Sequence, residues 1–119
     1  MMAKEIQIFK ESSSDFTQRT IVENQILVVR IKYNVRNDSW FLNITTENYS
    51  IQDLKLVINY PILYNHKALF PVLTGDLIIM PKVDNLVENL SYDNFGNDFG
   101  LFYIDASELT EWELTNGIR

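Results

Sequence analysis

The strongest constraint on the fold is the stretch from Gln25 to Tyr33, in which side chains alternate with a period of two. Large apolar residues occupy every second position: Leu27, Val29, Ile31 and Tyr33. Residues of mixed character lie between them: Val28, Arg30 and Lys32. Because successive side chains of a β-strand point to opposite faces, this pattern predicts a strand with one face in the core and one toward water.

A second strand follows closely, and the two together predict a β-hairpin. The segment from Asn34 to Ser39 is rich in residues that favour turns. After it the alternation resumes, with one face made of Trp40, Leu42 and Ile44. A register slip of one residue would turn the whole apolar set outward, so residues 25 to 45 are expected to be the most specified part of the fold.

Shorter patterns predict further strands on both sides of this hairpin. We expect them at Glu5 to Phe9, Phe16 to Val22, Leu77 to Met80 and Leu101 to Ile104. The serines from Ser12 to Ser14 separate the first two. The run from Leu77 to Met80 is apolar throughout and follows a turn at Thr74-Gly75, which is typical of a central strand buried on both faces. The stretch from Tyr49 to Leu63 suits either a strand or a short helix. The stretch from Lys82 to Gly100 is rich in Asp and Asn and predicts a long loop, which includes a weak helical spacing at Leu86, Val87 and Leu90.

These segments predict an all-β protein. Alanine, the best helix former, occurs only at Ala3, Ala68 and Ala106, whereas β-branched and aromatic residues are plentiful. Six to seven short strands at spacings near ten residues favour a single small barrel or sandwich over a parallel α/β sheet. We expect one domain over residues 1–104 and an acidic C-terminal tail over residues 105–119.

The tail is expected to be extended or to form a short helix. Asp105 or Ser107 can cap such a helix, and Gly117 can end it. On a helix, Glu108, Leu109 and Trp112 share one face, so the tail either docks on a basic partner surface or folds back on its own domain. Apolar side chains in loops and tail are the expected partner-binding residues: Phe95, Phe99, Leu109 and Trp112.

Composition and motifs argue against catalysis and against bound cofactors or metals. The chain has no cysteine, which excludes disulfides and thiolate metal sites. Its single histidine, His66, excludes metal motifs that need two histidines. There is no Gly-x-Ser-x-Gly turn for a hydrolase and no phosphate-binding glycine loop near Gly96 and Gly100. The segment from Asp93 to Asp98 fails the EF-hand order. Acidic pairs such as Glu111 and Glu113 are abundant only because the tail is acidic.

The charge distribution narrows the possible partners. Residues 1 to 83 hold nine basic and eight acidic side chains, whereas residues 84 to 119 hold eight acidic ones and only Arg119 as a base. Nucleic-acid binding needs clustered Lys and Arg, so no nucleic-acid site is predicted. No apolar run is long enough for a membrane span, and the N-terminus lacks the apolar core of a secretory signal, so the chain is expected to be soluble and not secreted.

The order of these segments resembles the small baseplate plug proteins of contractile-tailed bacteriophages, of the type found in cyanophage baseplates. Four segments carry the resemblance: Leu27 to Tyr33, Ser39 to Ile44, Leu73 to Ile79 and Phe99 to Ile104. They correspond to a strand with apolar and basic residues in alternation, a Trp that opens the next strand, a Gly-x-Leu strand and a Gly step before an aromatic strand. The resemblance covers residues 15 to 104, with Phe99-Gly100 in place of Leu-Gly and an added tail from Asp105 to Arg119.

The resemblance implies a non-enzymatic structural protein of the virion, made in the host cytoplasm. It would act as a plug at the tail axis, in several copies, and would contact the hub, tube or spike. Two other classes stay open on the sequence alone. A ligand- or carbohydrate-binding β-domain would use an exposed aromatic such as Trp40, its neighbour Phe41 or Trp112, and a small enzyme would place His66 beside a carboxylate in a pocket.

Overall fold

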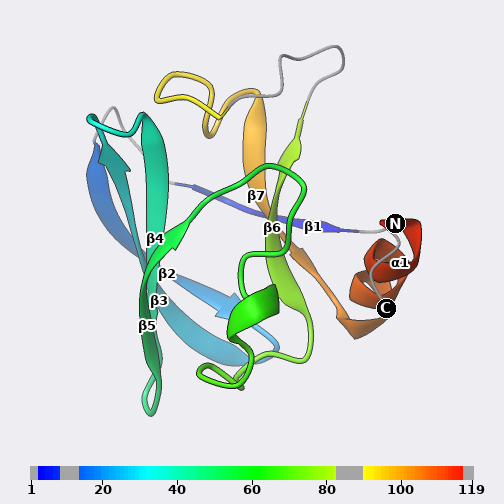
Figure 1. Ribbon diagram of the computed structural model, residues 1–119. Helices are drawn as coiled ribbons and strands as arrows, with labels where there is room; N and C mark the ends of the chain where they lie inside the picture. The colour runs from blue at the N-terminus through cyan, green and yellow to red at the C-terminus, as the bar shows by residue number, and fades with distance from the viewer. Residues whose placement is uncertain (1–2, 9–13, 83–89, 117–119) are drawn as a thin grey trace.

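Two antiparallel β-sheets and one short helix make up the structure (Figure 1). A computed structural model describes residues 3–8, 14–82 and 90–116. The four-stranded sheet consists of β2 (Asp15–Val22), β3 (Gln25–Asn34), β4 (Ser39–Thr45) and β5 (Ser50–Lys55), in this order. The three-stranded sheet has the order β1-β7-β6 and consists of β1 (Lys4–Ile6), β7 (Phe99–Ile104) and β6 (Asp76–Pro81). A 3₁₀ turn, η1 (Tyr64–His66), precedes β6, and the helix α1 (Ala106–Thr115) follows β7.

The four-stranded sheet is a meander built around the hairpin that the sequence predicts. In the register of β3 and β4, Tyr33 lies opposite Trp40. The alternating apolar residues of both strands are buried, except Tyr33, which is half-buried. A two-residue turn joins β2 to β3, and its residues Glu23 and Asn24 have φ angles of 52° and 62°. Two consecutive positive φ angles match the right-handed twist of the strands that such a turn connects.

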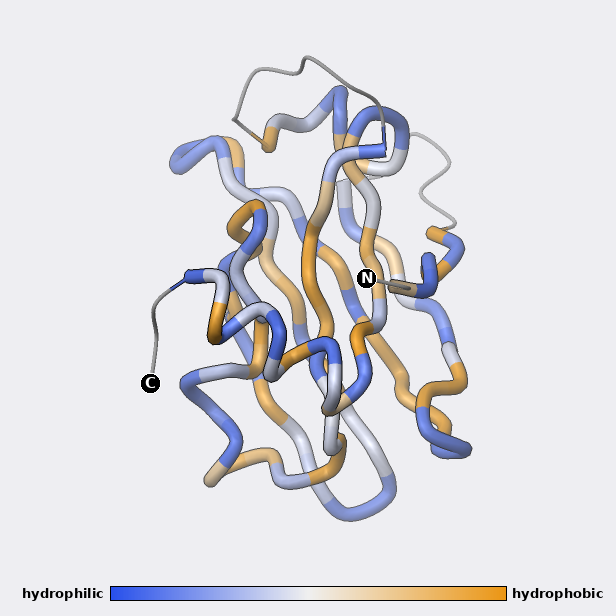
Figure 2. The backbone as a smooth tube through the Cα atoms, turned by 90° about the vertical axis from the view of Figure 1, so that its right-hand side faces the viewer, coloured by the Kyte–Doolittle hydropathy of each residue, from blue (hydrophilic) through white to orange (hydrophobic). Residues whose placement is uncertain are grey.

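The main core lies between the two sheets. It is formed by the inward residues of all four strands of the larger sheet and by the matching residues of the smaller one: Ile6, Leu77, Ile79, Phe99 and Leu101. Figure 2 shows the hydrophobic stretches along the strands and hydrophilic residues at many of the turns. The two sheets therefore face each other as a sandwich and do not close into a barrel, which decides between the two predicted architectures.

Part of the outer face of the three-stranded sheet is covered by α1, together with Tyr60 and Tyr64. Ile78 of β6 and Ile104 of β7 form a second buried cluster with Trp112 of the helix. Alternate residues of β6 thus enter different cores, since Leu77 and Ile79 face the other sheet while Ile78 faces α1. This explains why the strand reads as a continuous apolar run. The layers are four-stranded sheet, three-stranded sheet and helix.

Two expectations are corrected or completed by the structure. The central strand of the smaller sheet is β7, whereas the sequence favoured β6, which lies at the edge of the sheet. On the free side of β6, the amides of Asn59 and Ile62 donate hydrogen bonds to the carbonyl oxygens of Ile79 and Leu77. The ambiguous stretch from Tyr49 to Leu63 contains the strand β5 and no helix. Phe9, the serines at 12 and 13, the helical spacing at Leu86 and Val87, and the helix stop at Gly117 lie outside the described residues.

Candidate functional site

Two surfaces on opposite sides of the molecule are candidates for function. One is the side formed by α1 and the other is the outer face of the four-stranded sheet, which lie at the right and left of Figure 1. The helix carries two of the residues that the sequence singles out, Leu109 and Trp112. The sheet face is the only large strand surface that no other described element covers.

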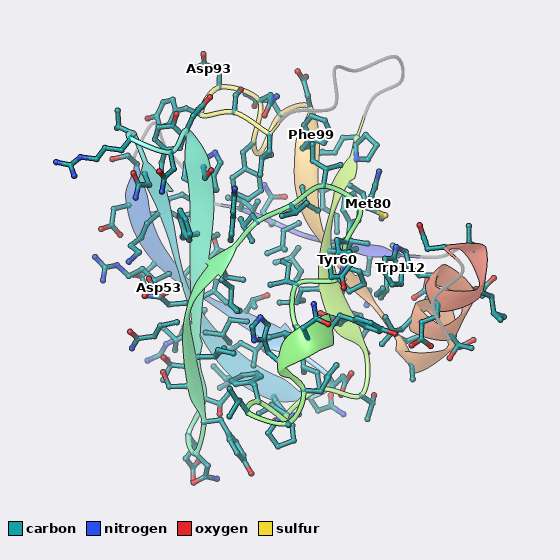
Figure 3. All side chains as sticks on the ribbon, viewed as in Figure 1. Asp53, Tyr60, Met80, Asp93, Phe99 and Trp112 are labelled. Carbon is teal, nitrogen blue, oxygen red and sulfur yellow. The ribbon has the colours of Figure 1, made fainter. Side chains whose placement is uncertain are left out.

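Trp112 points from α1 toward β6 and lies beside Tyr60 (Figure 3). Its side chain is 6% exposed, and its ring centroid lies 5.3 Å from that of Tyr60 and 5.5 Å from that of Tyr64. The indole Nε1 donates a hydrogen bond of 3.0 Å to the carbonyl oxygen of Asn59. Trp112 therefore anchors the helix to its own domain, which is one of the two arrangements that the sequence leaves open.

The start of α1 is fixed by a capping box. The Asp105 carboxylate accepts a hydrogen bond from the Glu108 amide at 2.8 Å, and the Glu108 carboxylate accepts one from the Asp105 amide at 3.0 Å. Glu108 is buried by this contact, and Leu109 is half-buried against the cluster around Trp112. Leu114, in contrast, is 63% exposed. The apolar side chain that α1 presents to solvent is thus Leu114.

Phe95 and Phe99 lie in the core between the sheets. Both side chains are almost completely buried, and the ring of Phe95 lies 5.2 Å from that of Trp40. The loop before β7 folds over Trp40, whose indole Nε1 donates to the Ser91 carbonyl oxygen at 2.9 Å and whose ring stacks on Tyr92. These two phenylalanines therefore lie in the core of their own domain, and a role in partner binding stays a prediction.

No tryptophan of the described chain forms an exposed platform for a sugar. Trp40 is fully buried and Trp112 nearly so. Phe41, the neighbour of Trp40, is half-buried on the outer face of the four-stranded sheet. The rings of both tryptophans thus pack against aromatic side chains of the protein itself.

A buried carboxylate lies near His66 but has no contact with solvent. Asp76 is completely buried, and its Oδ1 accepts hydrogen bonds from the amides of Leu63 and Leu77 at 2.9 and 2.6 Å. Burial raises the pKa of Asp76 to about 6, although these amides and the charges of Lys67 and His66 oppose the shift. Because no surface of Asp76 is open to a substrate, the pair is not an acid–base site of the kind that the sequence left open.

Other candidate groups form no site among the described residues. Those residues contain no cluster of three or more His, Cys, Asp or Glu side chains that could hold a metal. Glu113 accepts a hydrogen bond of 2.5 Å from the Tyr64 hydroxyl, and Glu111 is exposed. The turn from Asp93 to Asp98 is held by backbone hydrogen bonds to the Asn94 carbonyl oxygen. None of the described helices is long and apolar enough to span a bilayer.

The basic residues of strands β2 to β5 lie on the outer face of the four-stranded sheet. Arg30 forms an ion pair with Asp15 at 2.6 Å, and its hydrogen bonds and charge lower the pKa of that carboxyl. Lys32 lies 3.5 Å from Asp53, which projects from the outer side of β5 (Figure 3). Arg19 and Lys55 on the same face are exposed and have no ion-pair partner among the described residues. Sequence alternation places these residues outward, but only the sheet order brings them together.

Two isoleucines lie at one end of this face. Ile21 of β2 and Ile26 of β3 are directly opposite each other in the strand register. Their side chains are 74% and 57% exposed. This pair is not among the residues that the sequence predicts for partner contact, although the alternation of β3 already places Ile26 on the outer face. A pair of exposed isoleucines beside unpaired positive charge is a surface suited to protein contact.

Comparison with protein families agrees with the resemblance that the sequence suggests. The family model described as "Cyanophage baseplate Pam3 plug gp18" matches residues 3–107. The match includes all seven strands and ends within the first turn of α1. No curated protein matches the chain. Since the match spans most of the 119 residues and both sheets, the chain belongs to the cyanophage baseplate plug family.

Proposed function

We propose that this protein is a non-enzymatic structural component of a contractile phage tail, located in the baseplate. It acts as a plug at the tail axis and contacts the hub and the tube, in several copies. The single observation that carries this proposal is the family match over residues 3–107. The match includes every strand, so it rests on the whole sandwich and not on one short motif.

The distribution of polar and apolar groups supports a role in assembly. The buried polar groups of three side chains form internal hydrogen bonds: Trp40 and Trp112 donate to carbonyl oxygens, and Asp76 accepts from backbone amides. The surface retains unpaired charges and exposed apolar side chains on the sheet and the helix. A protein whose surface contacts other proteins requires such residues, whereas an isolated domain gains little from them.

Mass spectrometry of purified virions tests the proposal. Virions of the phage that encodes the chain are purified and separated into heads and tails, and peptides of this protein are quantified against tube and capsid peptides. The protein is expected in the tail fraction, at a fixed ratio to the hub protein. Recovery only from the lysate, or a ratio to tail proteins that varies between preparations, would argue against a structural role.

A further inference from the structure

An exposed apolar pair on the four-stranded sheet has no cover from the described chain. Ile21 and Ile26 face each other across β2 and β3 on the outer face, at the end nearest the turn between the two strands. A solvated sheet face normally carries polar side chains at such positions. Two large apolar side chains in direct opposition therefore indicate a surface that is covered in the assembled state.

The charge around this pair is positive. Arg19, two residues before Ile21 on the same face, is exposed and has no ion-pair partner among the described residues. The outer face as a whole carries four basic and two acidic side chains: Arg19, Arg30, Lys32, Lys55, Asp15 and Asp53. This excess of positive charge occurs on a chain whose net charge is −6, so the partner of this face is expected to be acidic.

The solvent side of α1 has the complementary character. Leu114 is its exposed apolar side chain, and Glu111, one turn earlier, is exposed on the same face. The helix and its cap contain four acidic residues and no basic one: Asp105, Glu108, Glu111 and Glu113. The helix C-terminus adds partial negative charge next to Leu114, and its last turn holds no basic side chain that would neutralise it.

We propose that α1 of one copy docks on the β2–β3 patch of a second copy. In this contact Leu114 packs against Ile21 and Ile26, and the Glu111 carboxylate pairs with the Arg19 guanidinium. Each surface combines exposed apolar side chains with an unpaired charge, and the two charges have opposite signs. Within the described residues, neither charge can pair with its complement in the same chain, because the two surfaces lie on opposite sides of the molecule (Figure 1).

The arrangement of the two surfaces makes the contact heterologous. Every copy uses its helix toward one neighbour and its sheet toward the next, as in rings and other head-to-tail assemblies. The contact is small, so it is expected to be weak between free molecules and to gain strength where several copies are held together. This inference depends only on the two surfaces and does not require the baseplate location proposed above.

Cysteine cross-linking of the full chain tests the contact, because the protein has no cysteine of its own. One variant carries Leu114→Cys and the other carries Ile26→Cys, both at exposed positions where the fold is not disturbed. The two are mixed under mild oxidation, and disulfide-linked dimers are quantified over time. The mixture is expected to form dimers at least about tenfold faster than either variant alone. The matched control pairs Leu114→Cys with Leu69→Cys, which is 73% exposed in the loop after η1.

Charge reversal in the same assay tests the proposed ion pair. Arg19→Glu in the Ile26→Cys chain, or Glu111→Arg in the Leu114→Cys chain, is expected to slow cross-linking several-fold, and the two reversals together are expected to restore it. Lys55→Glu serves as the control, since this substitution makes the same charge change at the other end of the sheet face. Lys55 of β5 lies there, opposite Phe41 of β4 in the strand register. Its effect on the rate is expected to be small at physiological salt.

Every other result overturns the proposal. Faster linking of Ile26→Cys to itself would show a two-fold contact between sheets, and faster linking of Leu114→Cys to itself would show a contact between helices. A rate for the mixture equal to that of the Leu69→Cys control would show that the patch has a different occupant. Because the assay uses the purified protein, these outcomes are independent of whether virions contain it.

Discussion

The carboxylate of Glu23 accepts a hydrogen bond of 2.6 Å from the hydroxyl of Tyr103 and so joins the two sheets. Glu23 lies in the β2–β3 turn of the larger sheet, and Tyr103 lies in the central strand of the smaller one. The same carboxylate accepts hydrogen bonds of 2.9 Å from the amides of Thr74 and Gly75. Burial acts to raise the pKa of Glu23, but these hydrogen bonds outweigh it and lower the pKa overall.

Removal of the Tyr103 hydroxyl is expected to destabilise the protein. Tyr103→Phe keeps the ring and removes one donor to a carboxylate, which costs about 1–2 kcal/mol in the free energy of unfolding. Urea denaturation measures the difference. Tyr49→Phe is the control, since the Tyr49 side chain is exposed and is expected to change stability by less than about 0.5 kcal/mol. Equal effects of the two variants would show that the contact between Glu23 and Tyr103 adds no stability.

The buried Asp76 is expected to make stability fall as the pH rises from about 4 to about 6. Its pKa is raised from 3.8 to about 6, so in this range the folded state binds more protons than the unfolded state, and the slope of stability against pH is negative. Above pH 6 the penalty is complete, at about 3 kcal/mol. Below pH 3.8 it is absent.

Asp76→Asn tests this directly, because an amide of the same shape keeps an acceptor for the amides of Leu63 and Leu77 but does not titrate. The stability of the variant relative to the parent is expected to improve by about 3 kcal/mol between pH 4 and pH 7. Urea denaturation at a series of pH values measures it. A difference that stays constant over this range would contradict the raised pKa.

Trp112 is expected to hold α1 on the domain, whereas Leu114 is not. Trp112→Ala removes a buried aromatic side chain and its hydrogen bond to Asn59, which costs about 3–5 kcal/mol. Leu114→Ala shortens an exposed side chain and is expected to change stability by less than about 0.5 kcal/mol. Thermal and urea unfolding give both values. Deletion of residues 106–119 should resemble Trp112→Ala, since it uncovers Ile78 and Ile104.

Gly75 is expected to be irreplaceable for a steric reason. A Cβ atom at this position would lie 2.1 Å from the carbonyl oxygen of Ile104, which is backbone and cannot move aside as a flexible side chain can. Gly75→Ala is therefore expected to cost at least about 3 kcal/mol. Gly96→Ala is the comparison, because Gly96 has a φ of +95° but open space around it, so backbone strain alone costs about 1–2 kcal/mol. If Gly96→Ala were the more damaging of the two, close packing at Gly75 would not be the dominant constraint.

Local pattern was sufficient to predict most of the strands from the sequence, whereas β5 and the helix were each one of two alternatives. The alternation from Gln25 to Ile44 predicted both the hairpin and its buried face, and the helix cap is Asp105, one of the two residues that the sequence offered. The predictions of the all-β class and of the family are also confirmed, because both depend on the order of short segments in the chain. These features depend on neighbours in the chain, which a single sequence displays.

The arrangement of the strands and the exposure of individual aromatics depend on residues far apart in the chain. The pairing of β7 between β1 and β6 joins three distant segments, so an apolar run alone led to the wrong central strand. Phe95 lies in a polar stretch that resembles a surface loop, but Trp40 provides a buried site for its ring. Trp112 is buried in the same way by Tyr60 and Tyr64. Such long-range contacts leave no periodic signal in the sequence.

Cryo-electron microscopy of isolated tails tests the proposed position of the protein on the tail axis. The map at the baseplate should contain the sandwich of a four-stranded and a three-stranded sheet, with α1 on the smaller one, on the tail axis between the hub and the tube. Difference maps against tails from a phage in which the gene is deleted would identify that density. If the protein is the axial plug, the axial density disappears in the deletion map. Axial density that remains unchanged, or a loss confined to the periphery of the baseplate, would contradict it.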